Sequence, residues 1–281
     1  MDGLMEKRKA QFPDEAELSR LRDLAAVIRQ NALAKLPELL EQLETQCRLN
    51  GIQVHWAQTT DEACEIVLQI ASKHDARSVI KGKSMVSEEM DLNRFMEAHG
   101  IECLESDLGE YLVQIAGETP SHIIMPAIHK NREQIAQLMA DKHGTPYTDD
   151  VNAMTQNARA LLRDKFMQAD IGISGVNFAV AESGTLCLVE NEGNGRMSTT
   201  APPVHIAVMG IEKVVERLEH VPPLLSLLTS SATGQHITTY FNMITSPRKP
   251  GEKDGPTSSH LVLLDNERTS MYWDAELRDT R

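Results

Sequence analysis

From residue 51 onward, short apolar and β-branched runs alternate with longer stretches of helical periodicity. Ile52, Val54 and Trp56 alternate with polar residues and predict a strand, and Thr59 with Glu62 predicts the capped start of a helix. Further strands are predicted at residues 77–80, 101–104 and 121–128, and helices at residues 90–98 and 131–142. Strand–helix alternation at this spacing favours an α/β fold: a mostly parallel sheet flanked by helices on both faces.

The first 50 residues have a different pattern, without strand signals. Residues 15–50 place apolar side chains at helical spacing, and Pro37 interrupts them, so two helices are expected. We therefore predict a helical arm over residues 1–50 and an α/β domain over residues 51–281. The simplest role of the arm is to cover its own core; docking a partner subunit is the alternative.

Glycines punctuate the second half of the chain. Short strands are predicted at residues 171–174, 178–181 and 185–190, with Ser183-Gly184 as a hairpin turn between two of them. This pattern predicts a small antiparallel insertion in the parallel sheet. Two further strands are predicted at residues 204–209 and 260–264, and helices at residues 148–168, 212–218 and 224–228. No clear linker interrupts the chain, which favours one embellished domain.

Charge and hydropathy exclude several function classes. The 281 residues include 28 Lys and Arg against 41 Asp and Glu, a net charge of −13. An acidic surface argues against nucleic-acid and anionic-membrane partners, because both require a basic field. No apolar run approaches the roughly 20 residues that span a bilayer, so no membrane span is expected.

The cysteines are too scattered to form a metal site. Cys47, Cys64, Cys103 and Cys187 include no Cys-x-x-Cys pair. Zinc ribbons, ferredoxin clusters and thioredoxin motifs all need close pairs, so neither a metal nor a cluster is expected in this chain. Sparse cysteines and the absence of a signal peptide at the charged start predict a cytoplasmic location.

The strongest candidate binding loop follows the strand predicted at residues 77–80. Lys81-Gly82-Lys83-Ser84 places two cations, a glycine and a hydroxyl before a helix, at the carboxyl edge of the sheet. Free backbone N–H groups and the helix dipole favour an anion there. The alternative is a solvated loop in which Ser84 or Ser87 merely caps the helix.

A second candidate lies on the glycine-rich hairpin. Glu182 precedes Ser183, Gly184 and Thr185 at a turn, where a rigidly held carboxylate could act as a base or a nucleophile. Asn194, Gly195 and Arg196 follow, and they combine close backbone approach with a guanidinium for a carboxylate or phosphate. From these residues alone, ordinary turn chemistry explains the pattern better.

A third group is weaker. Asp107 and Glu110 precede His122 and His129, but they lack the helical spacing of a metal site. Each of these side chains is more simply explained as a surface or capping residue. No Gly-x-Ser-x-Gly elbow surrounds Ser183, which argues against serine-hydrolase chemistry.

Several motifs in one order resemble the lactate utilization domain family. They are residues 81–89 (KGKSMVSEE), 106–111 (SDLGEY), 126–130 (PAIHK), 169–196, 254–256 (DGP) and 260–266 (HLVLLDN). The resemblance extends from about Leu18 to the end of the chain. It is closest to the B-type members, the iron–sulfur subunits of a bacterial L-lactate oxidation complex.

This resemblance implies a fold like that of glucosamine-phosphate deaminase, ribose-phosphate isomerase and CoA transferases. In that fold, a cleft would place Lys81, Lys83 and Ser84 on its anion-binding side. Glu182, Ser183, Gly184 and Thr185 would line the other side. Fold likeness alone does not fix the reaction, because such folds host many activities.

The resemblance also implies a function and a missing part. The chain would be a component of a complex that oxidises L-lactate to pyruvate, binding a small carboxylate or phosphate ligand and other lactate utilization subunits. A stand-alone transferase or isomerase that uses Glu182 on a CoA ester or sugar phosphate is one alternative, and a non-catalytic assembly module is another. B-type relatives continue into cysteine motifs for two [4Fe–4S] clusters, which we expect beyond residue 281.

Overall fold

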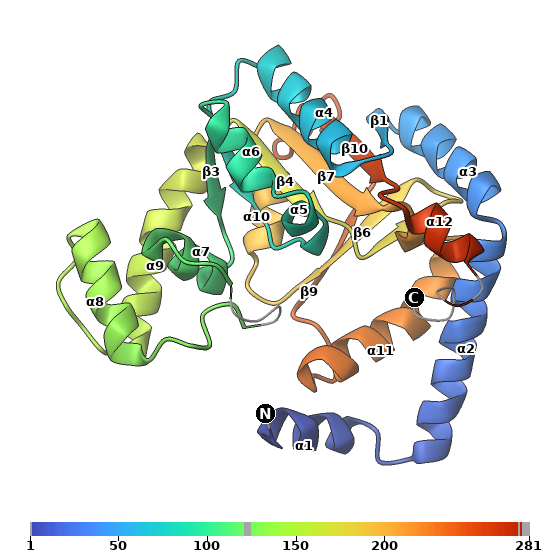
Figure 1. Cartoon of the computed structure of the whole chain (residues 1–281), viewed down its shortest axis with the longest axis horizontal. Coiled ribbons are helices and arrows are strands. Elements are labelled where there is room, and N and C mark those ends of the chain that lie inside the picture. The colour runs from blue at the N-terminus through green and yellow to red at the C-terminus, as the bar shows by residue number, and fades with distance from the viewer. Residues whose placement is uncertain (1, 121–124, 275, 277–281) are drawn as a thin grey trace.

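A six-stranded parallel sheet forms the centre of the protein in the computed structural model, which describes residues 2–120, 125–274 and 276 (Figure 1). The strands lie in the order β1 (Ile52–Ala57), β10 (Ser258–Leu264), β7 (Val204–Gly210), β4 (Ile171–Gly175), β2 (Ser78–Lys81) and β3 (Glu102–Glu105). Every neighbouring pair is parallel. The predicted α/β class with a parallel sheet is confirmed.

One face of this sheet is covered by three helices. They are α4 (Thr60–Lys73), α5 (Met85–Glu89) and α6 (Leu92–Ala98). Val67 of α4 and Met96 of α6 share one buried cluster with Val79, Ile173 and other sheet residues. The cluster forms because alternate residues of a buried strand point to the same face. The helix expected at residues 90–98 begins at Leu92 instead, because Asp91 before it adopts a left-handed conformation with φ 48°.

The opposite face is shared between helices and a second sheet. Near β2 and β3 it is covered by α7 (Leu108–Ala116), α9 (Val151–Gln168) and α10 (Asn194–Thr200), and α8 (Arg132–His143) packs outside them (Figure 1). Near β1, β10 and β7 it packs against α3 (Leu36–Leu49) and the second sheet. Leu43 and Cys47 of α3 are fully buried in that core.

The second sheet has four strands in the order β8 (Val214–Val215), β5 (Phe178–Val180), β6 (Thr185–Glu190) and β9 (Tyr240–Ile244). It is mixed, because β5 pairs in parallel with β8 while β6 is antiparallel to both β5 and β9. The prediction that residues 171–174 belong to this insertion is wrong: β4 is a central strand between β2 and β7. Its sequence is equally compatible with either sheet, because pairing partners are not encoded locally.

The N-terminal residues form α1 (Asp2–Gln11), α2 (Glu15–Ala34) and α3. The expected break near Pro37 is confirmed: α2 ends before Lys35, and Pro37 lies in the first turn of α3. Ala25 and Ile28 of α2 pack on the outer face of the second sheet together with α11 (Val221–Thr233). The arm and the α/β body therefore share buried cores, and a domain boundary at residue 50 stays a prediction.

Two more local predictions differ from the structure. The helix expected at residues 212–218 is instead the 3-10 turn η1 (Ile211–Lys213), strand β8 and the 3-10 turn η2 (Leu218–His220). Burial of Val214 and Val215 against β5 outweighs their weak helical pattern. A strand was also expected at residues 121–128. Residues 121–124, which include His122, lie outside the described residues, and Pro126 to His129 form turns instead of a strand.

The carboxyl end of β10 leads into α12 (Arg268–Trp273). Arg268 is buried and binds Glu89 of α5 through both terminal guanidinium nitrogens, at 2.7 and 2.9 Å, and Glu212 through Nε at 2.7 Å. These ion pairs join α5, η1 and α12 over the carboxyl edge of the central sheet. None of the helices in the described ranges is long and apolar enough to cross a bilayer.

Candidate functional site

Lys81 is fully buried and already paired. Its ammonium lies 2.8 Å from the carboxylate oxygens of both Glu88 and Glu105, and 3.0 Å from the Ser87 hydroxyl. Burial alone lowers the pKa of Lys81, but the two carboxylates outweigh it and raise the pKa above its ordinary value. The side chain therefore stays charged and neutralises carboxylates of this protein.

Glu110, on the first turn of α7, completes this group, which we call the Lys81 cluster (Lys81, Ser87, Glu88, Glu105 and Glu110). Burial and the neighbouring Glu105 carboxylate raise the pKa of Glu110 to about 8. One oxygen on each of Glu105 and Glu110 is buried without a hydrogen-bond donor. With this raised pKa, Glu110 keeps its proton at neutral pH and can donate it to the neighbouring Glu105 carboxylate.

The rest of the predicted anion loop is built into the fold. The Ser84 hydroxyl caps α5 by accepting the Ser87 N–H at 3.3 Å, which is the alternative considered from the sequence. The Gly82 N–H donates to Ile173 O at 2.9 Å, beside Gly195. Lys83 is half-buried, and its charge acts on Glu192. A ligand role for this loop stays a prediction.

The hairpin with Glu182 lies against α3. The amide of Asn50 donates to Ser183 O at 2.8 Å, and a β-carbon on Gly184 would lie 2.7 Å from Cys47 N. The hydroxyls of Ser183 and Thr185 bond to each other at 2.8 Å. Glu182 is exposed, and its carboxylate accepts the Leu218 N–H at 2.8 Å. These groups are therefore occupied by contacts within the turn and its neighbours.

The structure does not bring this hairpin to the Lys81 loop. The turn lies at the start of β6, whereas Asn194, Gly195 and Arg196 follow its far end, where Gly195 lies beside Gly82. Six strand residues separate the two ends, roughly 17 Å at about 3.4 Å per residue. The implied single cleft between Lys81 and Glu182 is therefore not present in the described residues.

The start of α10 is also occupied by the chain itself. The Glu190 carboxylate accepts the N–H of Gly195 and of Arg196, both at 2.7 Å, and the Asn242 amide at 3.0 Å. A carboxylate at a helix start is favoured by the exposed N–H groups and the helix dipole. The backbone N–H groups of Gly195 and Arg196 are therefore not available to an external anion. The guanidinium of Arg196 remains available.

The Arg196 guanidinium lines an open pocket of about 680 Å³ at the carboxyl edge of the sheet. We call it the arginine pocket, because Arg159 and Arg163 of α9 line it as well. Its other lining residues are Ser106, Leu108, Thr155, Ala158, Leu162, Phe166, Glu192, Gly193, Asn194, Met197 and Tyr240. Arg196 lies over the Tyr240 ring, 5.6 Å from its centroid. Of the predicted site residues, Asn194 and Arg196 thus share one pocket.

The charges of the arginine pocket are not balanced by the protein. Within the described part of the chain, the guanidinium groups of Arg159, Arg163 and Arg196 form neither ion pairs nor hydrogen bonds. Glu192 supplies the one carboxylate among the lining residues, and it accepts the Leu108 N–H at 3.3 Å. Burial and the charge of Asp107 raise the pKa of Glu192. The pocket is therefore a local positive site on an acidic protein.

Arg159, Arg163 and Tyr240 were not among the residues predicted from the sequence. The two arginines are one turn apart on α9, and this i, i+4 spacing is visible in the sequence. Nothing local indicates that this stripe faces Arg196, which is 33 positions from Arg163 along the chain. Glu110 was also singled out from the sequence, but its partner Glu105 was not.

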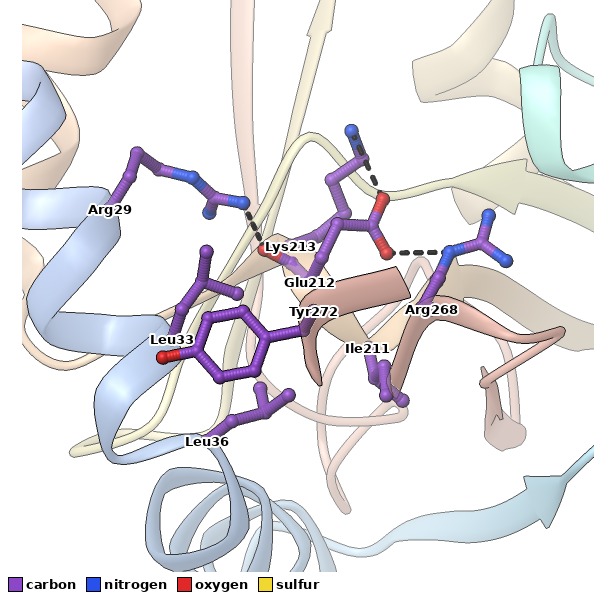
Figure 2. A pocket seen from close by; sticks show the side chains of 8 residues that line it. All are labelled: Arg29, Leu33, Leu36, Ile211, Glu212, Lys213, Arg268 and Tyr272. Atoms are coloured by element: carbon purple, nitrogen blue, oxygen red, sulfur yellow. Dashed lines mark hydrogen bonds and ion pairs between the residues drawn. The ribbon is translucent and has the colours of Figure 1, made fainter. Parts of the chain in front are cut away.

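A smaller pocket of about 220 Å³ lies between α2, α3, η1 and α12 (Figure 2). Leu33, Leu36, Ile211 and Tyr272 form its apolar side. Its charged side chains converge on Glu212: Arg268 and Lys213 bind the carboxylate, and Arg29 donates to its backbone oxygen (Figure 2). Because these charges are paired, the arginine pocket is the better candidate anion site.

The described residues offer no grouped set of donors for a metal ion or an iron–sulfur cluster. All four cysteines are free, buried and separate, and burial raises the pKa of Cys47 and Cys187 to about 12. The described residues contain no group of three or more His, Cys, Asp or Glu side chains that could hold a metal ion.

Comparisons with known proteins agree with the motif series. The chain is 45% identical to lactate utilization protein B of Bacillus licheniformis over 251 residues, which cover 89% of this chain and 53% of the relative. It is 44% identical over 258 residues to an uncharacterized electron transport protein, YkgF, of Escherichia coli, covering 92% and 54%. The chain thus spans about half the length of these curated relatives.

A solved structure is also similar. A DUF162 family protein from Deinococcus radiodurans aligns with a TM-score of 0.46 at 15% identity, over 82% of this chain and 98% of that one. The model of the LUD domain matches residues 40–264, from the middle of α3 to the end of β10. Together with the identities above, this match shows that the chain belongs to the LUD domain family.

Proposed function

We propose that this chain is part of a protein that oxidises L-lactate to pyruvate together with other lactate utilization subunits, and that it binds a carboxylate or phosphate ligand in the arginine pocket. The names of its relatives support the lactate context, and one relative is named for electron transport. The observation that carries the binding role is the group of three unpaired guanidiniums in one pocket.

The chemistry of guanidinium supports an anionic ligand. Arg presents a planar fork of N–H donors that matches two oxygens of a carboxylate or phosphate. The pocket lies outside the carboxyl ends of parallel strands, where open α/β sheets bind ligands. Three like charges near one another repel, so an anion that neutralises them gains favourable electrostatic energy.

The remaining parts of the proposal concern the longer protein. We place the [4Fe–4S] clusters outside residues 1–281, because the four separated cysteines cannot hold one. A cytoplasmic location is consistent with four free thiols. Glu182 lines neither the arginine pocket nor the smaller pocket, so no observation favours the transferase alternative.

The test uses the full-length protein and the Arg159→Ala/Arg163→Ala double variant. Titration calorimetry with L-lactate, pyruvate and inorganic phosphate should show at least one anion that binds the wild type, with affinity falling about 10-fold or more in the variant. Arg94→Ala is the matched control, because Arg94 is an exposed arginine far from this pocket. Replacement of the gene by the double variant should slow growth on L-lactate. Equal affinities and equal growth would contradict the proposal.

A further inference from the structure

The arginine pocket is larger than a three-carbon acid needs. Its volume of about 680 Å³ falls in the range of roughly 300–1,000 Å³ typical of pockets that enclose drug-sized ligands. Lactate or inorganic phosphate alone would leave most of this space to water. The size therefore points to a ligand with a body as well as an anionic group.

The wall formed by α9 has two parallel rows of side chains. Ala158, Leu162 and Phe166 are spaced by four residues and form an apolar row that is at most 8% exposed and packs into the core behind the pocket. Thr155, Arg159 and Arg163, with the same spacing, form a polar row beside it. A ligand on this wall therefore meets the exposed polar row, and the apolar surface left to it comes from the partly exposed Leu108, Met197 and Tyr240.

The part of the lining that comes from β9 and α10 is suited to a flat ring. Arg196 lies over the face of Tyr240, and Met197 of α10 lies next to Arg196 in the pocket lining. The guanidinium over the ring places a cation beside an aromatic face, and methionine makes favourable contacts with aromatic rings. Such a surface recognises the π-face of a base or a similar ring.

The charges distinguish between a phosphate and a carboxylate. Three guanidiniums and the Glu192 carboxylate leave an excess of two positive charges. A phosphate monoester carries about −1.5 to −2 at pH 7 and balances this excess, whereas a monocarboxylate leaves one charge uncompensated. Arg159 and Arg163 are also one helical turn apart and can bind one phosphate from two directions.

We propose that the arginine pocket binds a mononucleotide, with its phosphate on Arg159 and Arg163 and its aromatic base against the partly exposed Leu108, Met197 and Tyr240. This inference rests on the proposed function, in which the same pocket is an anion site, and it names the ligand class. The nucleotide would be a bound ligand of the lactate utilization protein; L-lactate itself would not occupy this pocket.

The experiment compares five probes on the full-length protein: adenosine 5′-monophosphate, flavin mononucleotide, adenosine, inorganic phosphate and L-lactate. Calorimetry should show that one of the two mononucleotides binds at least 10-fold more tightly than phosphate, adenosine or lactate. Arg159→Ala/Arg163→Ala should remove the advantage of the nucleotide over the nucleoside. Tyr240→Ala should weaken nucleotide binding without weakening phosphate binding. Arg94→Ala is again the control, and thermal melts verify that each variant is folded.

The possible failures separate the two proposals. If phosphate or lactate binds at least as tightly as both mononucleotides, and the arginine variant weakens that binding, the mononucleotide assignment is wrong while the anion site stands. If none of the anions binds, or if the arginine variant binds each of them as the wild type does, the anion site itself is overturned. Tight nucleotide binding that is insensitive to the arginines would place the nucleotide elsewhere and overturn this inference.

Discussion

The Lys81 cluster and the arginine pocket lie at the same edge of the central sheet but on opposite faces. The Lys81 ammonium points to the α5–α6 face and is within 2.8 Å of two carboxylates. The three guanidiniums of the arginine pocket lie on the α9–α10 face, and the described residues provide them with no carboxylate partner. The paired group is buried and supports the fold, whereas the unpaired group is exposed and available to a ligand.

This difference shows how burial and pairing decide what a cation does. A charge withdrawn from water needs a partner of opposite sign, because desolvation otherwise costs several kcal/mol. An exposed guanidinium remains hydrated without a partner, and its stability cost is small. Lys81, which stands out in the sequence, is therefore paired within the protein, whereas the candidate site combines Arg196, which also stands out, with Arg159 and Arg163, which do not.

The largest effect is expected for Lys81→Met. The substitution removes the cation but leaves Glu105 buried beside Glu110, and breaking a buried pair from one side typically costs about 3–5 kcal/mol. Urea denaturation should report this loss, whereas Arg163→Ala should stay within about 0.5 kcal/mol of the wild type. A loss below about 1 kcal/mol for Lys81→Met would show that the Lys81 cluster is not structural.

Gly172→Ala should disturb the arginine pocket and leave the Lys81 cluster intact. A β-carbon at Gly172 would lie 1.7 Å from the backbone oxygen of Ser198, so α10 must move off β4. Overpacking of this kind costs about 1–3 kcal/mol or more, and it should weaken anion binding by displacing Arg196. Gly82→Ala is the control, because its β-carbon would make an ordinary 3.5 Å contact with Gly195. Equal stability of the two variants would contradict this packing.

Glu110→Gln tests the proton held by Glu110 through pH. The folded protein keeps this proton up to about pH 8, whereas an unperturbed glutamate releases it near pH 4.5. The contribution of Glu110 to stability is therefore present below about pH 4.5 and is lost as the pH rises to 8. Glu110→Gln removes this titration and should therefore flatten the fall in the free energy of unfolding between pH 4.5 and 8. Because one pKa unit corresponds to about 1.4 kcal/mol, the difference should be up to a few kcal/mol.

The loss of unfolding free energy at acidic pH serves as the control for Glu110→Gln, because other groups cause it. Burial, together with the charges of neighbouring histidines, lowers the pKa of His205 and of His260 to about 4. Their contribution is present above about pH 6.5 and is lost as the pH falls through 4. The Gln variant should leave this acidic loss unchanged, and parallel profiles from pH 5 to 8 would show that Glu110 holds no proton.

The smallest effect is expected for Glu182→Ala. It removes one exposed acceptor of the Leu218 N–H, a bond worth about 0.5–1.5 kcal/mol. Because the hairpin lies at the other end of β6, anion affinity in the arginine pocket should not change. Urea denaturation and calorimetry measure the two quantities. A large loss of lactate-dependent growth at unchanged stability would return Glu182 to the functional site.

Much of the fold could be predicted from local pattern. Alternation at Ile52, Val54 and Trp56 gave β1, Pro37 marked the break between α2 and α3, and Ser183-Gly184 formed the expected hairpin turn. These features depend on side chains within a few residues of one another. The strand at residues 171–175 was identified but assigned to the wrong sheet, because its burial pattern does not specify its neighbours.

The candidate site could be predicted only in part. Asn194 and Arg196 were singled out and lie in the arginine pocket, whereas Lys81 and Ser84 are occupied by internal contacts. Whether a cation is paired depends on residues far away in sequence: Glu105 is 24 positions from Lys81, and no local signal connects them.

The sequence by itself determined the family, the α/β class, most strand and helix positions and the chemistry of each candidate loop. The tertiary structure decided which of these loops meet. Helical and strand periods are set by nearest-neighbour backbone geometry and can be read along the chain. Pairing, burial and the sharing of a pocket depend on contacts between distant segments, so only folding separates the paired Lys81 from the unpaired arginines.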